Sequence, residues 1–194
     1  MQRGFYFDQT RCTGCYTCVI ACKDWHETEI GGEPEDWIQI VSITKGAFPD
    51  LFRAYLAMPC LHCENPACVN ACPVGAISKR DEDGIVVVDR DVCLGNKDCN
   101  AYCKSACPYD VPAFGPKKGA KMQKCDLCLK RFEEGKDPVC VNACPMFALD
   151  SGTLNELRVK YGDIRETEGF TYEKSIAPSI TFKSKAQGQV ASMK

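Results

Sequence analysis

The sequence predicts an α+β fold in which bound metal, more than a large apolar core, holds the chain together. The chain has 194 residues, of which 16 are cysteines, a share at which cross-links or metal sites must be considered. These cysteines fall into four runs of four, and short apolar segments of strand length precede three of the runs. This length fits one or two domains.

Each run of cysteines ends in the same spacing, Cys-x3-Cys, and the last three runs continue directly into proline. The runs are Cys12-x2-Cys15-x2-Cys18-x3-Cys22, Cys60-x2-Cys63-x4-Cys68-x3-Cys72, Cys93-x5-Cys99-x3-Cys103-x3-Cys107 and Cys125-x2-Cys128-x11-Cys140-x3-Cys144. Residues 72–77 and 144–149 also share a pattern of proline, small and aliphatic residues. We interpret the runs as copies of a duplicated half-ferredoxin unit.

The first run has the ligand spacing of a [4Fe-4S] ferredoxin. Three thiolates two residues apart fit around one cubane, whereas the fourth cysteine lies a helical turn further on and ligates a second cluster. Soft thiolate ligands select iron–sulfur clusters, zinc or copper(I). The sequence therefore predicts a tandem ferredoxin-like arrangement, with two bacterial-type 2[4Fe-4S] modules and four clusters.

Because each fourth cysteine serves another cluster, the runs must pair. The second and third runs are 20 residues apart and both end in Cys-Pro, which favours one module from this pair and another from the first and fourth runs. Pairing of the first run with the second stays open. The favoured pairing predicts a first quartet of Cys12, Cys15, Cys18 and Cys144, a second of Cys60, Cys63, Cys68 and Cys107, a third of Cys93, Cys99, Cys103 and Cys72, and a fourth of Cys125, Cys128, Cys140 and Cys22.

The predicted outer module comprises residues 1–59 and 120–152, and the inner module comprises residues 60–119. Within the outer module, residues 23–51 are interpreted as an insertion loop with an extra strand at 37–43. Residues 153–194 are expected to form a C-terminal helix and a docking tail.

Strands are expected at residues 4–8, 52–58 and 85–89, where each would lead into a ligand run. The segment 153–161 predicts an amphipathic helix, capped by Ser151 or Thr153 and ended by Gly162. The tail beyond it includes a candidate strand at 178–183 but lacks periodicity, so we expect it to order only against a partner.

Zinc and disulfides are the alternatives to clusters. Structural zinc sites usually combine two Cys-x2-Cys knuckles across a longer loop, and only the fourth run comes near that pattern. Disulfide frameworks suit short secreted chains, and cysteines two residues apart on a tight loop make poor cross-links. Clusters are therefore the preferred interpretation of all four runs.

Charge and hydropathy exclude two classes of partner. Lys and Arg are dispersed, so the chain has no basic stripe suited to nucleic acid. No apolar segment approaches the roughly 18 residues that would cross a bilayer. The N-terminus shows neither an apolar targeting segment nor twin arginine. Because thiolate-bound clusters are assembled in a reducing compartment, we expect a cytoplasmic protein that is exported or membrane-associated only through partner subunits.

No catalytic constellation accompanies the cysteines. His26 and His62 lie close to ligand runs, and structural roles are favoured over hydrogen bonds to a cluster. Packing around the insertion loop is the favoured role of Trp25 and Trp37.

These motifs resemble the four-cluster iron–sulfur subunits of the dimethyl sulfoxide reductase family of molybdopterin enzymes. Residues around the ligands carry the resemblance as well as the ligands themselves, in segments 8–24 (DQTRCTGCYTCVIACKD), 60–76 (CLHCENPACVNACPVGA), 84–93, 124–150 and 154–158. The resemblance implies the same pairing, first run with fourth and second with third. It also implies a separate catalytic subunit with a molybdenum or tungsten pterin and, often, a membrane anchor that handles quinones.

One run departs from this family. The family's third run has two residues between its first and second cysteines, whereas here Asn96 stands at the position of the second ligand and the next cysteine is Cys99. The simplest interpretation is that Cys99 replaces the missing ligand from a longer loop. A [3Fe-4S] cluster is the alternative.

The expected function is therefore electron transfer through four clusters, between the pterin-containing subunit and either a quinone-linked membrane subunit or a soluble carrier. The chain would be a non-catalytic subunit of an oxidoreductase complex. A free polyferredoxin, a relay subunit of a formate dehydrogenase or hydrogenase, and a zinc-stapled interaction module are the alternatives.

Overall fold

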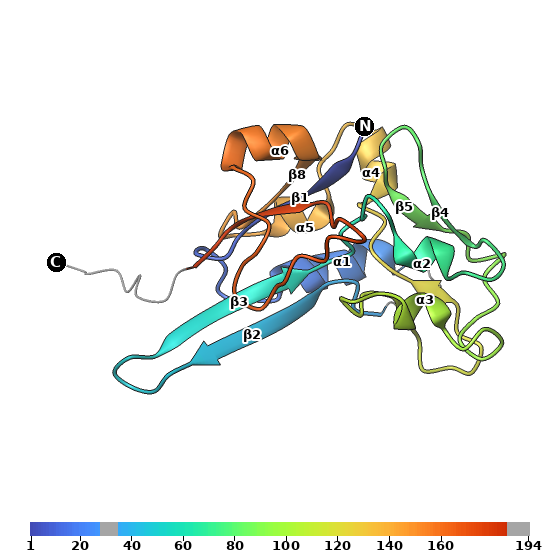
Figure 1. The fold of residues 1–194 in the computed structure, drawn as a ribbon, viewed down its shortest axis with the longest axis horizontal. Coiled ribbons are helices and arrows are strands. Elements are labelled where there is room, and N and C mark those ends of the chain that lie inside the picture. Colours follow the sequence, from blue (N-terminus) through green and yellow to red (C-terminus); the bar gives the residue numbers. More distant parts are fainter. Residues whose placement is uncertain (28–34, 186–194) are drawn as a thin grey trace.

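The computed structural model describes residues 1–27 and 35–185 and has the mixed α and β structure expected from the sequence (Figure 1). Antiparallel strand pairs connect successive cysteine runs. The pairs are β2 (Gln39–Lys45) with β3 (Phe52–Met58), β4 (Ile77–Lys79) with β5 (Val86–Val88), and β6 (Ala113–Phe114) with β7 (Met122–Gln123). The expected strands at 52–58 and 85–89 correspond to β3 and β5.

Two of the strand pairs relate the runs in an equivalent way. β1 (Arg3–Asp8) leads into the first run and pairs antiparallel with β8 (Leu149–Thr153), which follows the fourth run. In the same manner β5 leads into the third run and pairs with β4, which follows the second. The strands therefore join the first run to the fourth and the second run to the third.

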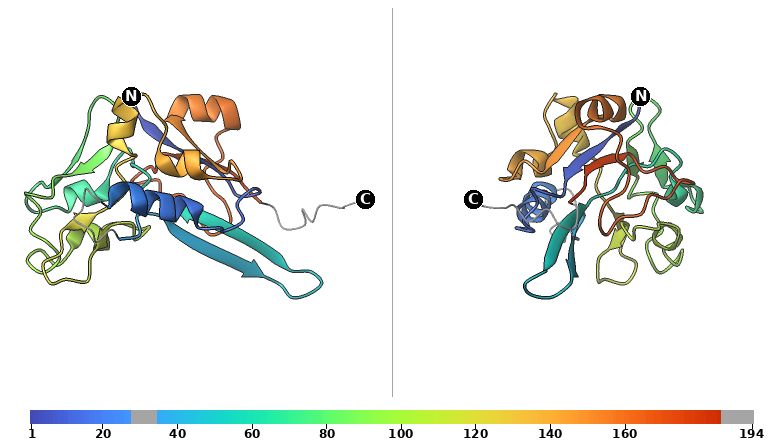
Figure 2. Two further views of the ribbon diagram at one scale, coloured as in Figure 1. Left: turned by 180° about the vertical axis from the view of Figure 1, so that it is seen from behind. Right: turned by 60° about the vertical axis from the view of Figure 1, so that its left-hand side comes forward.

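The helices that carry cysteines repeat this relation. α1 (Thr17–His26) carries Cys18 and Cys22 and packs against α5 (Val139–Ala143), which carries Cys140 (Figure 2). α2 (Ala67–Asn70) packs against α3 (Tyr102–Ser105), and these short helices belong to the second and third runs. Helices and strands thus bring the same pairs of runs together.

The segment between the first two runs is more regular than expected. Its first residues belong to α1, and residues 28–34 lie outside the described residues. The extra strand expected at 37–43 is present as β2, two residues later, and forms a long hairpin with β3 that projects from the body (Figure 1). None of the residues of β2 is buried, so this strand depends on its antiparallel pairing with β3.

The C-terminal part folds against its own chain. α6 (Leu154–Tyr161) is capped by Thr153, whose side chain forms a capping box with Glu156, and it ends before Gly162, as expected. The expected strand in the tail is β9 (Ile180–Lys183), which pairs in parallel with β1. The expectation that the tail orders only against a partner was therefore wrong through residue 185, because pairing with β1 buries its apolar side chains.

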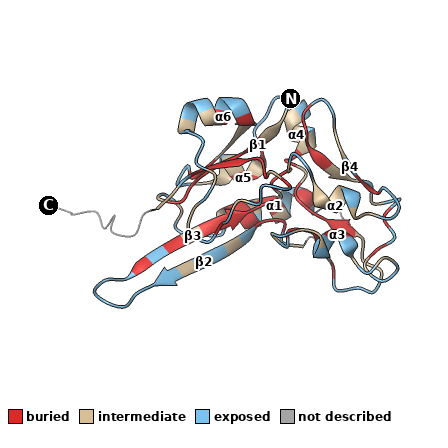
Figure 3. Cartoon of the chain, viewed as in Figure 1, coloured by how far each residue is buried: buried red, intermediate tan, exposed pale blue. Residues whose placement is uncertain are grey.

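Buried residues concentrate in β1 and β3 (Figure 3). Phe5 and Phe7 of β1 and Phe182 of β9 are almost fully buried, together with Ile85 before β5. A smaller apolar cluster packs between β4, β5 and β7. α4 (Leu129–Glu133) lies at the edge, where the Arg3 guanidinium covers the Phe132 ring. Over the described ranges, the helices are too short or too polar to cross a membrane.

Gly4 is a sensitive position of the three-stranded sheet. A Cβ at residue 4 would collide with the carbonyl oxygen of Ser179, the acceptor for the Phe5 amide. We expect Gly4→Ala to lower the free energy of unfolding by about 1–3 kcal/mol, measured by anaerobic thermal unfolding. Gly152→Ala is the matched control, because Gly152 faces Gly4 across β1 and β8 and a Cβ at residue 152 would meet no atom closer than 3.6 Å. Equal unfolding midpoints for the two variants would contradict this account.

Candidate metal centres

The first quartet lies where β1 ends and α1 begins. Cys12 and Cys15 lie on the connecting loop, Cys18 lies in the first turn of α1, and Cys144 directly follows α5. All four line one cavity, with Phe7 among its apolar walls. Burial, followed by the charges of Cys12 and Cys144, raises the pKa of Cys18 to about 11. The thiols are thus close enough for their thiolates to repel one another.

Cys22, one turn beyond Cys18 on α1, belongs to a different group of thiols. Burial raises the pKa of Cys22 above its ordinary value, and the charge of Cys128 is the next cause. Burial also raises the pKa of Cys125 and of Cys140, and Cys22 is among the charges that raise both further. One helix therefore supplies cysteines to both the first and the fourth quartets.

The second quartet lines a separate cavity between the 60–68 loop and the 107–112 segment. Burial raises the pKa of Cys63, and the charges of Cys60 and Cys107 add to this effect. Burial and the charge of Cys60 raise the pKa of Cys68 to about 12, while the ammonium of Lys124 opposes the shift. Cys107 from the third run is thus placed among cysteines of the second.

The third quartet gathers around α3. Burial raises the pKa of Cys103 to about 11, and the charge of Cys99 is the largest further cause. Cys93 and Cys72 add smaller contributions of the same sign. Cys72, the last cysteine of the second run, therefore lies beside the cysteines of the third run.

The residue at the departure from the family pattern has a structural role. The Asn96 side-chain oxygen accepts a hydrogen bond from the Gly119 amide at 3.0 Å, and the Asn96 amide donates to the Ala120 carbonyl at 3.0 Å. Asn96 thereby joins its loop to residues 117–121. Cys99 lies near Cys103, and its thiol donates to the Gly95 carbonyl at 3.2 Å.

Backbone amides donate to cysteine sulfurs around several of the quartets. The Ala76 amide lies 3.2 Å from the Cys72 sulfur, and the Ala148 amide lies 3.4 Å from the Cys144 sulfur, at equivalent places after two Cys-Pro turns. Further donors are Met122 to Cys93, Leu127 to Cys125 and Val139 to Cys128. Such hydrogen bonds favour thiolates and raise the reduction potentials of clusters bound by them.

Two electrostatic interactions and one shared cavity wall relate the quartets in a row. Cys18 of the first quartet is among the charges that act on Cys140 of the fourth. Cys103 of the third quartet acts on Cys68 of the second. Lys124 precedes Cys125 of the fourth quartet, and its side chain lines the cavity of the second. The resulting order is first, fourth, second, third.

The donor sets fit iron–sulfur clusters. All sixteen cysteines lie in the described part of the chain, and all are free thiols, so the disulfide alternative has no support. Each quartet offers four cysteine sulfurs, which is the ligand set that a [4Fe-4S] cluster needs, and the cavities of the first and second quartets have apolar walls. Bound iron would also relieve the repulsion among the buried thiolates.

Comparison with known proteins identifies the family. A family model described as a 4Fe-4S dicluster domain matches residues 51–154. One chain of the anaerobic dimethyl sulfoxide reductase of Escherichia coli strain K12 is 42% identical over 197 residues, covering 97% of this chain and 91% of the relative. This protein belongs to the iron–sulfur subunits of the dimethyl sulfoxide reductase family.

Other relatives of this iron–sulfur subunit are named for other reactions. The thiosulfate reductase electron transfer subunit of Salmonella typhi is 38% identical over 154 residues, covering 79% of this chain and 77% of the relative. A sulfite dehydrogenase subunit of Allochromatium vinosum is 34% identical over 173 residues, covering 80% and 70% respectively. Family membership therefore establishes iron–sulfur clusters as the cofactor class and leaves the substrate of the complex open.

Both histidines of this iron–sulfur subunit are buried beside cysteines. His26 Nε2 lies 3.8 Å from the Cys128 sulfur and 3.7 Å from an Asp126 oxygen, so it belongs to the surroundings of the fourth quartet. His62 accepts a hydrogen bond from the Val86 amide through Nδ1 at 2.9 Å. Burial, and then the charge of Lys124, holds the pKa of His62 well below its ordinary value. His62 is therefore neutral and structural.

The two tryptophans differ in burial, and only Trp37 is packed in the interior. Trp37 is buried, its ring lies 4.2 Å from that of His26, and its indole donates to the Gln123 side chain at 3.2 Å. Trp25 is more exposed, and the Arg131 guanidinium lies 4.9 Å from its ring centre. Trp37 thus contributes to the wall behind the fourth quartet.

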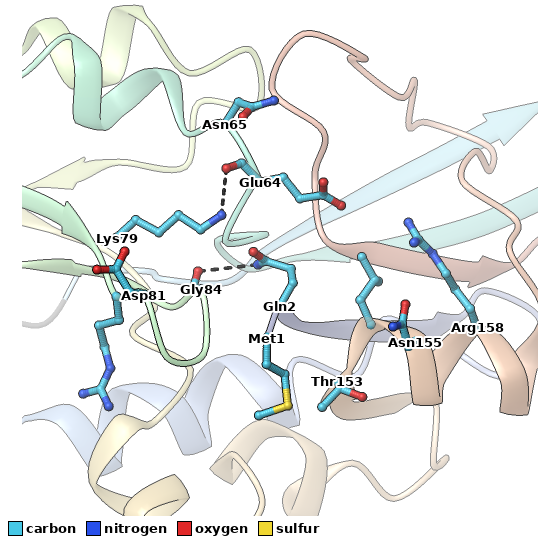
Figure 4. A pocket seen from close by; sticks show the side chains of 12 residues that line it. Met1, Gln2, Glu64, Asn65, Lys79, Asp81, Gly84, Thr153, Asn155 and Arg158 are labelled. Atoms are coloured by element: carbon cyan, nitrogen blue, oxygen red, sulfur yellow. Dashed lines mark hydrogen bonds between the residues drawn. The ribbon is translucent and has the colours of Figure 1, made fainter.

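One pocket of about 590 Å³ has no cysteine among its lining residues. Figure 4 shows polar side chains around it, including Lys79, whose ammonium donates to the Glu64 carbonyl at 2.7 Å, and Gln2, which donates to the Gly84 carbonyl at 3.5 Å. Arg158 at its rim pairs with Asp163 at 2.9 Å. The size of this pocket does not make it a candidate metal centre, because no cysteine lines it.

Proposed function

We propose that this chain relays electrons through four [4Fe-4S] clusters between a separate catalytic subunit that holds a molybdenum or tungsten pterin and a second redox partner. The clusters supply one-electron acceptors, and each is held by one quartet. The two ferredoxin-like modules of this proposal pair the first run with the fourth and the second run with the third. Apolar groups around the first and second quartets, and amide donors to cysteines of the other two as well as the first, limit water and set the potentials.

The row of quartets is the observation that carries this proposal. Each quartet has a neighbour, and the order first, fourth, second, third gives the row two ends. A row with two ends suits transfer between two different partners. A zinc-stapled interaction module has no need for such an order.

Exposed apolar side chains at both ends support docking of partners. Beside the first quartet, Ile20 is 63% exposed and Phe147 is 76% exposed. Beside the third quartet, Tyr102 is 50% exposed and Leu94 is 43% exposed. Large apolar groups that gather at the surface mark interaction sites. This distribution favours a subunit with two docking faces over a freely diffusing polyferredoxin.

The second partner in this proposal is a quinone-linked membrane subunit or a soluble carrier. Cluster assembly requires a reducing compartment, which supports assembly in the cytoplasm. Attachment to a membrane, or export, would then occur through the partner subunits.

Anaerobic purification from the native source tests the proposed function. We expect about sixteen iron atoms and as many acid-labile sulfides per chain, four of each for every cluster, with a broad brown absorbance. We also expect a pterin-containing subunit to copurify. Four zinc ions and a colourless protein would overturn the cluster proposal, and recovery of a brown chain alone would overturn the subunit proposal.

A further inference from the structure

Lys124 is a buried cation among the quartets. Lys124 is only 4% exposed. Its ammonium donates hydrogen bonds to the backbone carbonyl of Cys125, at 2.9 Å, and to that of Val86. None of the ion pairs within the described residues involves Lys124. Two carbonyl groups compensate only part of the cost of burying a full positive charge, so a further negative group is expected nearby.

The cavity of the second quartet supplies the place for that negative group. Lys124 lines this cavity with Cys60, Cys63, Cys68 and Cys107. A [4Fe-4S] cluster with four thiolates is anionic, and it gains one further negative charge when it is reduced.

The backbone of β5 fixes the position of the ammonium. The Val86 amide donates to His62 Nδ1 at 2.9 Å, while the Val86 carbonyl accepts from Lys124. His62 lies between Cys60 and Cys63 in the chain, and Lys124 directly precedes Cys125. One residue of β5 thus joins the loops of the second and fourth quartets and holds the ammonium between them.

We propose that Lys124 raises the reduction potential of the second-quartet cluster by placing a buried positive charge beside it. This inference rests on one part of the proposed function, namely that the second quartet holds a cluster. The cation stabilises the reduced, more negative state over the oxidised state. Because the site is buried, water and salt screen this interaction less than they would at the surface.

Redox titrations of the anaerobically loaded chain, followed by electron paramagnetic resonance, test the proposal. In Lys124→Gln, which keeps a donor but removes the charge, we expect one couple to become at least about tenfold harder to reduce, or about 59 mV lower for one electron. Lys124→Arg, which keeps the charge, should restore the potential. The affected signal should be the one that Cys60→Ala removes.

Lys104→Gln is the matched control. Lys104 also adjoins a cysteine of a quartet, Cys103, but its side chain is 45% exposed and its ammonium lies 3.5 Å from Asp110, so water should screen the charge and the potentials should stay nearly unchanged. Equal reduction potentials of the second-quartet cluster in wild type and Lys124→Gln would overturn the proposal.

Loss of the second-quartet cluster in both Lys124 variants would also overturn it, whereas loss in Lys124→Gln alone would support a need for the charge. A wild-type chain without iron would instead refute the proposed function.

Discussion

Replacing Cys99 by alanine is expected to remove or damage one cluster and to leave three intact. Cys99 is the neighbour whose charge acts most strongly on Cys103, and with its loss the third quartet keeps only three thiolates. Three thiolates hold at best a three-iron cluster. We therefore expect the chain to lose about one to four iron atoms. The electron paramagnetic resonance signal of one [4Fe-4S] cluster should be lost as well.

Asn96→Ala is the control for this prediction. The Asn96 side chain bonds to the Gly119 amide at 3.0 Å, and its loss should cost about 1 kcal/mol of stability while the iron content stays near that of the wild type. If Asn96→Ala lost the cluster and Cys99→Ala retained it, the ligand assignment in the third quartet would be wrong.

Local patterns in the sequence predicted the elements that have local causes. The Thr153 capping box with Glu156 and the Gly162 terminus define α6 within its own residues. Alternating and apolar residues before the runs likewise predicted β1 and β3. Cysteine spacing predicted iron–sulfur ligation and the four quartets, because the geometry of a cluster strongly restricts the spacing of its ligands. The module boundaries and the binding of a cluster by each quartet remain predictions.

Features that depend on distant contacts could not be predicted in the same way. Ile180 and Phe182 became core residues only because β9 pairs with β1, at the other end of the chain. The burial of Lys124 depends on Val86, 38 residues away. A lysine before a ligand run looks like any solvated lysine until that contact is known, so no pattern in the sequence could have indicated its role.

The exchange of cysteines between runs is the central claim about this chain, and paired substitutions test it. Cys22→Ala combined with Cys128→Ala removes two thiolates of the fourth quartet, and the two that remain cannot hold a cubane. Cys18→Ala combined with Cys22→Ala removes one thiolate from each of two quartets, although both residues lie on α1. All three cysteines are buried, so the two double variants are matched in burial.

The measurement that decides the claim is the number of intact [4Fe-4S] clusters in these two double variants, from spin quantification and iron analysis of anaerobically prepared protein. We expect three intact clusters, with about twelve iron atoms, in the Cys22 and Cys128 variant, and two intact clusters in the Cys18 and Cys22 variant. If each run bound its own cluster, the order would reverse. Three intact clusters in the Cys18 and Cys22 variant, with two in the other, would contradict the exchange.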